Sequence, residues 1–359
     1  MDPAFNLIAD SSRPRDPNRL NNVFEQQVSK ANRVEIAVGY VDVRSLAYLR
    51  EVVEEQYPQL ELDLTIGIQS KEGMSRAQLD VARPLHDYLT REGRGGVYAT
   101  PRLPFHGKVF LFDHASGISA YVGSANLSSI VPDYKNTREV GVFFDSAPQN
   151  LEQHLRKEVY PLREPIDEAN IPVVAEELFM EELDAAEPVT VRELSTVLSS
   201  TPGPTFHIPL KTQAKSSLNA HRASGGYRVN SKTGSKKRRS WYEGEIIVPS
   251  EIYRLPDFPQ GGHDFRVLTD DGWSFVCGMT GTPAKNLRSK VGGLEPFGAW
   301  IKSRLVSAGA LKYGETATEE TLRKFGRKYM TITNYPEQNV WYFDLHVDEN
   351  TPLEIPDNE

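Results

Sequence analysis

The sequence predicts two domains of different class, an α/β domain first and a mostly β domain second. In the first half, apolar runs typical of buried strands alternate with helical patterns. After residue 205, short β-rich runs separated by turn residues dominate. The length of 359 residues also exceeds what one hydrophobic core usually supports.

The first domain begins with two strand–helix pairs. Residues 34–41 and 62–68 are apolar runs, and residues 43–56 and 77–89 carry apolar side chains at helical spacing. Strands that alternate with helices favour a largely parallel sheet with helices on both faces. We expect further strands at 97–102, 105–113, 120–123 and 139–144. A helix at 150–160 closes the domain.

Residues 166–203 are predicted to be an acidic linker, because carboxylates and prolines interrupt the pattern. Short helices are expected inside it near 173–183 and 191–198. The β domain is expected over 204–349, and residues 350–359 form an acidic tail. Five strands are predicted there, at 245–248, 264–268, 274–277, 329–332 and 340–345. Two helices are predicted at 297–306 and 318–325. This pattern is typical of a small open barrel.

The composition excludes several classes of protein. No run of about 18 apolar residues would span a membrane. The first residues lack the basic start and apolar stretch of a signal peptide. The single cysteine, Cys277, excludes an internal disulfide and a cysteine-based zinc site, so a reducing cytosol is expected.

The charge is unevenly distributed, although the net charge is −8. Residues 164–193 are crowded with carboxylates. From residue 211 to 242 there is no acidic residue, and the basic side chains are Lys211, Lys215, Arg222, Arg228, Lys232, Lys236, Lys237, Arg238 and Arg239. A chain polarised in this way can bind phosphates locally despite an acidic total.

The chemistry-bearing pattern is His106-Gly107-Lys108, followed by Gly123-Ser124-Ala125-Asn126. Strand periodicity places His106 and Lys108 on one face, and a following strand that ends in Ser124 and Asn126 can reach the same point. An imidazole can act as nucleophile or general acid on a phosphodiester, while an ammonium and an amide hold the non-bridging oxygens. A lone His-x-Lys is more often an exposed strand edge.

This pattern resembles the signature of the phospholipase D superfamily. The matching residues are His106, Lys108, Asp113, Gly123, Ser124 and Asn126. The gap from Asp113 to Gly123 is longer than in the family, and a longer hairpin turn at 115–117 would absorb it. The resemblance implies that an acidic residue orients the histidine, and Glu139 is the candidate. Asp113 alone would equally suit a strand turn.

Only one copy of the motif occurs, whereas an active site of this family uses two. The resemblance therefore implies a homodimer with one composite site on its two-fold axis. One His106 would form a phosphohistidine and the other would protonate the leaving oxygen. No carboxylate pair or ligand cluster of a metal nuclease is evident, so we expect no metal and activity in a chelator.

The second domain resembles the B3-like DNA-binding domain of restriction enzymes in the same superfamily. The resemblance rests on the stretches at 217–219, 226–230, 269–272, 309–311 and 325–327, which occur in the family's order. It implies a restriction endonuclease of the NgoAVII and CglI type, related to BfiI, in the bacterial cytoplasm. The fold expected is a phospholipase D-like domain at 1–165 followed by a B3-like pseudobarrel.

Such barrels grip double-stranded DNA with two arms, here expected at 211–241 and 280–290. Arginine and asparagine read base edges, whereas lysines mostly contact phosphates. The candidate DNA-binding residues are Asn219, Arg222, Arg228, Asn230, Arg239 and Lys285. A solvated flexible loop at 231–239 is an equal alternative.

The resemblance also implies a separate helicase-like ATPase subunit, which would supply the need for ATP and Mg²⁺. No phosphate-binding Gly-x-x-x-x-Gly-Lys-Ser/Thr sequence occurs in this chain. The acidic residues Glu176, Glu177, Glu181 and Glu182 either cover the active-site groove until DNA arrives or only solubilise the linker. A phospholipase or phosphatidyl transferase is the main alternative function, and an inactive scaffold that binds DNA is the third.

Overall fold

The computed structural model describes residues 5–10, 19–132, 139–174, 180, 183, 185–213, 217–229, 234 and 236–355, with the backbone alone at 5–10, 237 and 238. The chain forms two compact units, residues 1–175 and 176–359. The predicted acidic residues Glu176, Glu177, Glu181 and Glu182 lie outside the described residues. The domain boundaries proposed from the sequence stay predictions.

The first unit is built on an eight-stranded sheet in the order β1-β8-β7-β6-β2-β3-β5-β9. Its strands are β1 (Phe5–Asp10), β2 (Arg33–Val38), β3 (Glu61–Ile66), β5 (Gly95–Ala99), β6 (Lys108–His114), β7 (Gly117–Gly123), β8 (Glu139–Phe144) and β9 (Glu164–Pro165). Its helices are α1 (Leu20–Val28), α2 (Val43–Glu51), α3 (Gln69–Glu72), α4 (Arg76–Arg91) and α5 (Gln149–His154). A short pair, β4 (Met74–Ser75) and β10 (Val173–Val174), lies beside it.

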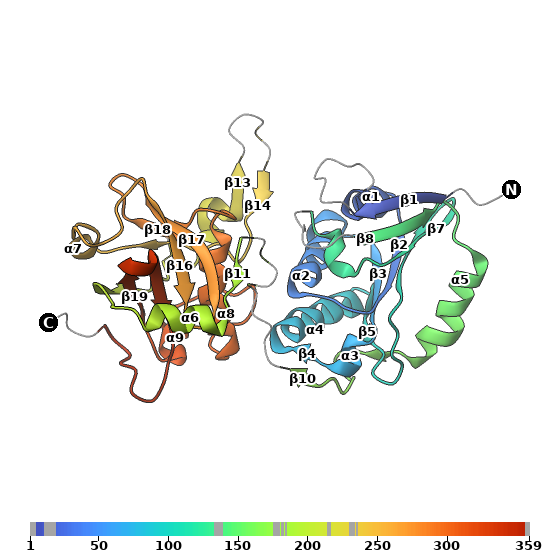
Figure 1. Cartoon of the computed structure of the whole chain (residues 1–359). Helices are drawn as coiled ribbons and strands as arrows, with labels where there is room; N and C mark the ends of the chain where they lie inside the picture. Colours follow the sequence, from blue (N-terminus) through green and yellow to red (C-terminus); the bar gives the residue numbers. More distant parts are fainter. Residues whose placement is uncertain are drawn as a thin grey trace. The chain divides into compact units, whose positions relative to one another are not determined.

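Helices cover both faces of this sheet, as the alternating pattern predicts. Figure 1 shows α1, α2 and α4 on one face and α5 on the other. On the α5 face, Ala37, Val109 and Leu111 pack against Leu155 and Val159. Burial of the valine and leucine side chains contributes roughly 1.5–3 kcal/mol each, which stabilises the packing of this helical segment on the sheet.

The expectation of a largely parallel sheet is wrong. Only β2, β3 and β5 run parallel, whereas β6, β7, β8, β1 and β9 join antiparallel. The reason is connection length, because β6 and β7 are joined by a short turn at 115–116 that cannot cross over the sheet. The strand predicted at 105–113 also begins later, at Lys108.

Part of the predicted linker is ordered in the second unit. The strand β11 (Glu187–Pro188) pairs with β17, and α6 (Val191–Leu198) is the helix expected at 191–198. Val197 of α6 is buried with Leu268, Tyr335 and Val340. The helix forms because Thr190 caps its N-terminus and accepts a hydrogen bond from the Glu193 N–H at 3.2 Å.

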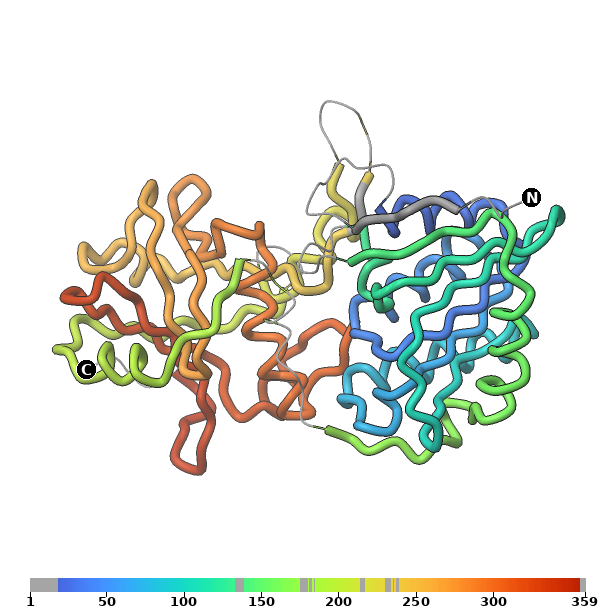
Figure 2. Tube along the Cα trace, turned by 45° about the vertical axis from the view of Figure 1, so that its right-hand side comes forward, coloured from blue at the N-terminus to red at the C-terminus, as the bar shows by residue number. Residues whose placement is uncertain are grey.

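The second unit is a mostly β structure whose sheet curls strongly into a half-barrel, which confirms the B3-like class. Its strand order is β12-β19-β20-β16-β17-β18-β15. These strands are β12 (Thr205–Pro209), β15 (Ile246–Ile247), β16 (Asp264–Thr269), β17 (Trp273–Thr280), β18 (Asn286–Ser289), β19 (Tyr329–Tyr335) and β20 (Val340–Asp344). A separate hairpin, β13 (Tyr227–Val229) and β14 (Lys236–Arg238), stands out from this unit (Figures 1 and 2).

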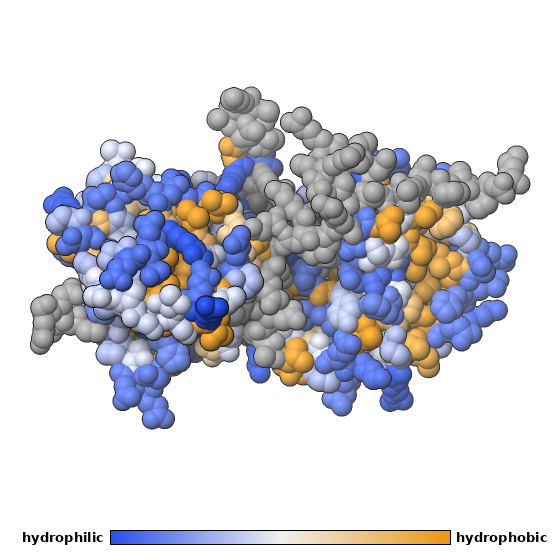
Figure 3. Space-filling model, in the orientation of Figure 1, coloured by the Kyte–Doolittle hydropathy of each residue, from blue (hydrophilic) through white to orange (hydrophobic). Residues whose placement is uncertain are grey.

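The helices of this unit are α6, α7 (Ser250–Tyr253), α8 (Glu295–Ser307) and α9 (Glu319–Phe325). Helix α8 is buried on nearly all sides, with Trp300 and Lys302 both fully enclosed. In the view of Figure 3, hydrophilic residues cover most of the described surface of this unit. Val191, Tyr227, Leu255 and Val291 are among its exposed large apolar side chains.

Candidate active site and DNA-binding surface

The candidate catalytic residues gather at one edge of the first sheet. Hereafter called the histidine cluster, they are His106, Lys108, Ser124, Asn126 and Glu139. Strands β2 and β7 end there, and β6 and β8 begin there. The register pairs Val38 with Lys108 across β2 and β6, and Gly123 with Gly141 across β7 and β8. Segments distant in the sequence therefore converge because neighbouring strands alternate in direction.

His106 lies in the turn before β6, and its side chain is exposed. Its ring meets the ring of Tyr40 edge to face, with centroids 5.5 Å apart and planes at 89°. A Cβ on Gly39 would lie 2.5 Å from Cδ2 of His106, so only glycine fits there without displacing the imidazole. Among the described residues, the imidazole nitrogens make no hydrogen bond, which leaves the ring available to a substrate.

Lys108 is the first residue of β6 and is buried, with 8% of its surface exposed. Its Nζ donates a hydrogen bond to the carbonyl oxygen of His106 at 2.8 Å. Burial lowers the pKa of Lys108, and the nearby Glu139 carboxylate opposes this change. The ammonium group therefore has few competing partners and can neutralise a phosphate oxygen.

Ser124 and Glu139 form a pair at the ends of β7 and β8. The Ser124 hydroxyl donates to the carboxylate of Glu139, and the backbone N–H of Val140 donates to the Ser124 oxygen at 3.1 Å. In the described part of the chain, no hydrogen bond or ion pair joins Glu139 to His106 of the same chain. The predicted role of Glu139 in orienting a histidine stays a prediction, because a second chain would have to provide that histidine.

Asn126 follows β7 and is half-buried. Its Oδ1 accepts a hydrogen bond from the backbone N–H of Tyr40 at 3.2 Å. This bond turns the amide so that Nδ2, which has no acceptor among the described residues, remains free to donate. An amide N–H₂ held open in this way suits an anionic oxygen.

The other resemblance-based residue, Asp113, lies at the opposite end of β6. Five residues at ~3.3 Å per residue separate it from Lys108, about 16 Å in all. The sequence analysis missed Gly39 and Tyr40, which touch His106 and Asn126. Their signal was available only as a glycine–aromatic pair after a buried strand, and nothing in it pointed to residues 66 or more positions away.

No described helix is long and apolar enough to cross a membrane. In the same described ranges, no group of three or more His, Cys, Asp and Glu side chains is placed to hold a metal ion.

In the second unit, the β13–β14 hairpin carries the predicted arginines at both of its ends. Arg228 lies on β13 and Arg239 directly follows β14. Both guanidinium groups pair with one buried carboxylate, that of Glu243, at 2.9 Å from Arg228 Nη2 and 3.1 Å from Arg239 Nε. Half of the Arg228 side chain remains exposed, against 16% of that of Arg239.

A buried lysine lies under this pair. Lys302 of α8 has no exposed surface, and its Nζ donates to the carbonyl oxygens of Trp241 and Glu243. Burial lowers the pKa of Lys302 well below its usual value, and Glu243 opposes that change. Burial also raises the pKa of Glu243, while Arg228 and Arg239 oppose it. The ion pairs of Glu243 and the hydrogen bonds of Lys302 thus fix the base of the hairpin, and the sequence did not predict them.

The remaining predicted DNA-binding residues differ in their surroundings. Asn219 is fully buried. Its Nδ2 donates to the carbonyl oxygens of Thr212 and Ala317, and its Oδ1 accepts from the Ala317 N–H. Arg222 is exposed and donates to Thr316 at 2.6 Å. Lys285 is half-buried beside the β17–β18 turn, and Asn230 lies outside the described residues. A base contact by Asn219 would require these internal bonds to break, and the base-contacting roles stay predictions.

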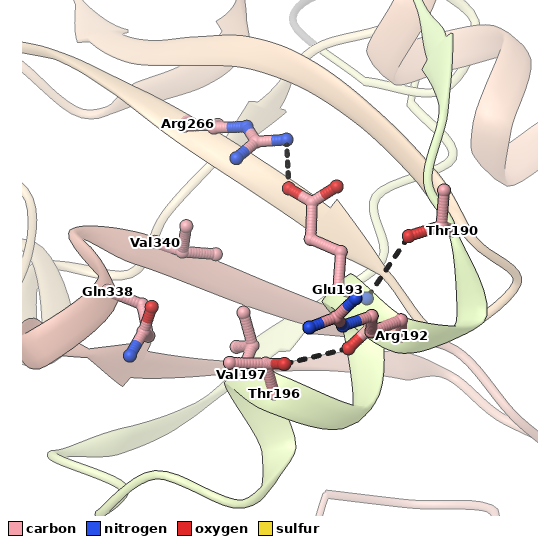
Figure 4. Close-up of a pocket in the computed structure, with 8 residues that line it drawn as sticks. All are labelled: Thr190, Arg192, Glu193, Thr196, Val197, Arg266, Gln338 and Val340. Atoms are coloured by element: carbon pink, nitrogen blue, oxygen red, sulfur yellow. Dashed lines mark hydrogen bonds and ion pairs between the residues drawn. The ribbon is translucent and has the colours of Figure 1, made fainter.

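A shallow pocket of about 270 Å³ lies between α6 and the curled sheet of the second unit (Figure 4). Inside it, Arg266 Nη2 pairs with Glu193 Oε1 at 2.7 Å. The lining contains no predicted site residue and consists of Thr190, Arg192, Glu193, Thr196, Val197, Arg266, Gln338 and Val340. The arginine is thus committed to an ion pair that ties α6 to β16.

Comparison with family models identifies both units. Residues 18–164 match the NgoFVII restriction endonuclease N-terminal PLD domain, and residues 196–336 match the NgoFVII C-terminal B3-like DNA-binding domain. The chain belongs to this restriction endonuclease family. Its first unit is a phospholipase D-type nuclease domain, and its second is a B3-like DNA-binding domain.

Solved structures resemble parts of this family member only loosely. NucT from Helicobacter pylori has 16% identity and a TM-score of 0.32, with 45% of this chain and 98% of that chain covered. Nuc from Salmonella typhimurium, a phospholipase D family member, has 14% identity and a TM-score of 0.32, with 46% and 98% covered. A phosphatidylserine synthase of Haemophilus influenzae has 14% identity and a TM-score of 0.35, with 47% and 40% covered. No curated protein sequence matches the chain, so the assignment rests on the family models.

Proposed function

We propose that this chain is the DNA-cleaving subunit of a restriction endonuclease that acts through a phosphohistidine intermediate without a metal ion at the nuclease site. The observation that carries the proposal is the histidine cluster. An exposed imidazole, a buried ammonium and an open amide N–H₂ converge at one sheet edge. Together they can attack a phosphodiester and neutralise its non-bridging oxygens.

The proposed reaction uses two chains, because each chain carries one His-x-Lys motif. His106 of one protomer attacks phosphorus, so that a P–N bond forms and the P–O bond to the leaving strand breaks. The second histidine donates a proton to that leaving oxygen. It then removes a proton from water, which attacks the phosphohistidine, breaks the P–N bond and restores both imidazoles. Lys108 and Asn126 hold the charged oxygens throughout.

The second unit supports DNA as the substrate, since it is a B3-like DNA-binding domain with a basic hairpin. This feature favours DNA over a phospholipid, the alternative substrate of the superfamily. Turnover of phosphatidylcholine vesicles in place of DNA would reverse that preference. A separate helicase-like ATPase subunit, with its own ATP and Mg²⁺, belongs to the proposal by family resemblance alone.

The test compares wild type with His106→Ala in excess EDTA, on plasmid DNA and on bis(p-nitrophenyl) phosphate. His154→Ala is the matched control, because His154 is an exposed histidine on α5 in the same unit. We expect hydrolysis by wild type and by the control, and a loss of at least about 10⁴-fold in His106→Ala. Acid-labile, alkali-stable phosphate on the protein would identify the intermediate.

Equal activity of wild type and His106→Ala would contradict the catalytic role of the histidine. Activity that disappears in EDTA and returns with Mg²⁺ would contradict a metal-free site. Cleavage of the model diester without cleavage of the plasmid would retain the chemistry and assign DNA cutting to a complex with the ATPase.

A further inference from the structure

We propose that Tyr40 is a positioning residue of the nuclease site, which orients Asn126 through its backbone and His106 through its ring. The geometry of this proposal comes from the contacts of Gly39 and Tyr40. Its effect on catalysis rests on the proposed phosphodiesterase function. Both residues follow the end of β2, at the sheet edge where the histidine cluster gathers.

The backbone of Tyr40 determines which atom of the Asn126 amide faces the substrate. Its N–H donates to Oδ1 at 3.2 Å, which leaves Nδ2 to donate to a phosphate oxygen. An amide in the opposite orientation would place its oxygen near the non-bridging oxygens and repel them. The bond to Tyr40 removes that alternative before the substrate binds, so no energy is spent on reorientation during the reaction.

The ring of Tyr40 restricts the imidazole. The two rings meet edge to face, with centroids 5.5 Å apart. Gly39 has no side chain, so the imidazole can lie against its backbone. His106 makes no hydrogen bond through its ring nitrogens among the described residues, so packing supplies its orientation. A nucleophile held by packing keeps both nitrogens available for attack and proton transfer.

Tyr40 is itself fixed at three points. Its hydroxyl donates to Glu72 Oε2 at 2.7 Å, and this bond raises the pKa of Tyr40. Gln69, which is 9% exposed, binds the chain on both sides of Tyr40. The Gln69 N–H donates to the Gly39 carbonyl at 3.1 Å, and its Oε1 accepts from the Val41 N–H at 2.7 Å. These contacts hold the aromatic ring of Tyr40 beside His106.

Three substitutions in the full chain separate these contacts. Tyr40→Phe removes only the bond to Glu72, Tyr40→Leu removes the ring, and Gly39→Ala adds a Cβ 2.5 Å from His106 Cδ2. No positive φ is required at Gly39, so alanine is compatible with its backbone. Tyr57→Leu, at a half-buried tyrosine of the same unit, is the control for loss of an aromatic ring.

Two readouts are measured for each variant: histidine ring NMR of the free protein, with His106 assigned by His106→Ala, and kcat and KM on bis(p-nitrophenyl) phosphate. Tyr40→Leu should shift the His106 signals and lower kcat about five-fold with KM unchanged. Gly39→Ala should displace the imidazole and lower kcat about 100-fold. Tyr40→Phe should retain at least about half of the wild-type kcat, since ring and backbone remain.

Unchanged His106 signals and kcat in Tyr40→Leu would overturn the positioning role. Equal losses in Tyr40→Phe and Tyr40→Leu with a raised KM would also overturn it, because they would place the hydroxyl on the substrate. A wild type without phosphodiesterase activity would end the proposed function but not this test. The NMR shift would then still show whether Tyr40 orients His106, and its absence would refute the proposal.

Discussion

The candidate functional side chains of the two units differ in how far they are paired within the protein. Among the described residues of the histidine cluster, the imidazole and the Asn126 Nδ2 have no hydrogen-bond partner, and Lys108 donates only to a backbone carbonyl. At the base of the β13–β14 hairpin, Arg228 and Arg239 are paired with the buried carboxylate of Glu243. Open donors suit a site that must neutralise phosphate at the moment of reaction, whereas paired cations suit a surface whose geometry must be fixed before contact.

The first prediction tests the open side of this comparison. Lys108→Met should lower the rate of phosphodiester hydrolysis about 10²–10³-fold, because it removes a charge that no other described side chain of the cluster replaces. The fold should persist, since the lysine contributes one hydrogen bond, to the His106 carbonyl. Single-turnover rates on the model diester measure the effect.

Lys157→Met is the matched control, since Lys157 is an exposed lysine in the same unit. A loss in Lys108→Met no larger than in this control would mean that the ammonium has no part in catalysis. The open side of the comparison would then rest on His106 and Asn126 alone.

The second prediction concerns pH and the paired side. Asp270 is bound by Arg304 through both carboxylate oxygens, at 2.8 and 3.2 Å. Burial raises the pKa of Asp270 to about 6 from an ordinary 3.8, with Asp271 and Asp344 adding to the rise and Arg304 opposing it. The folded state therefore retains this proton between pH 4 and 6, where the unfolded chain has released it.

Asp270 accordingly stabilises the second unit most below about pH 4, and this contribution is lost as the pH rises through 6. The shift corresponds to a fall in the free energy of unfolding of about 3 kcal/mol. Asp270→Asn should remove that slope, and the exposed Asp257→Asn should not. All four tryptophans lie in the second unit, so urea unfolding followed by tryptophan fluorescence at pH 4 and 7 measures it selectively. Equal pH slopes in wild type and Asp270→Asn would contradict the prediction.

Four residues of the histidine cluster could be predicted from the sequence because they lie at the ends of β6 and β7, two adjacent strands joined by a short turn. His106, Lys108, Ser124 and Asn126 fall within 21 positions, and strand alternation places them at one edge. Periodicity predicted the α/β class of the first unit and the mostly β class of the second, and the family resemblance predicted the phospholipase D-like and B3-like folds; these classes are confirmed. The prediction of a largely parallel sheet was wrong, because the short turn between β6 and β7, which brings these residues together, also forces the two strands to pair antiparallel.

The contacts that the sequence did not predict all depend on tertiary packing. Tyr40 reaches His106 from a strand end far back in the chain, and Glu243 meets Arg228 only after the hairpin folds back on α8. Asn219 illustrates the same limit, because nothing in its local sequence indicates that its amide is used inside the unit. Residue type predicts what a side chain can bind, but not which partner the fold supplies.

The third prediction, with the smallest expected effect, concerns Glu243. Glu243→Gln breaks the ion pairs of Arg228 and Arg239, and each guanidinium that then contacts a phosphate should steepen the salt dependence of binding by about one unit. Affinity for random-sequence duplex should rise about ten-fold at low salt. The matched control is Glu245→Gln, which has the same change in charge two residues along and no ion pair among the described residues.

A purely structural loss of the hairpin would weaken binding in Glu243→Gln, so the direction of the change separates the two explanations. Arg228→Gln, which leaves Glu243 in place, should instead reduce the salt slope. Fluorescence anisotropy over a range of NaCl concentrations measures both. Weaker binding in both variants would mean that the arginines only support the fold, and the contrast between an open nuclease site and a paired DNA-binding hairpin would be structural rather than functional.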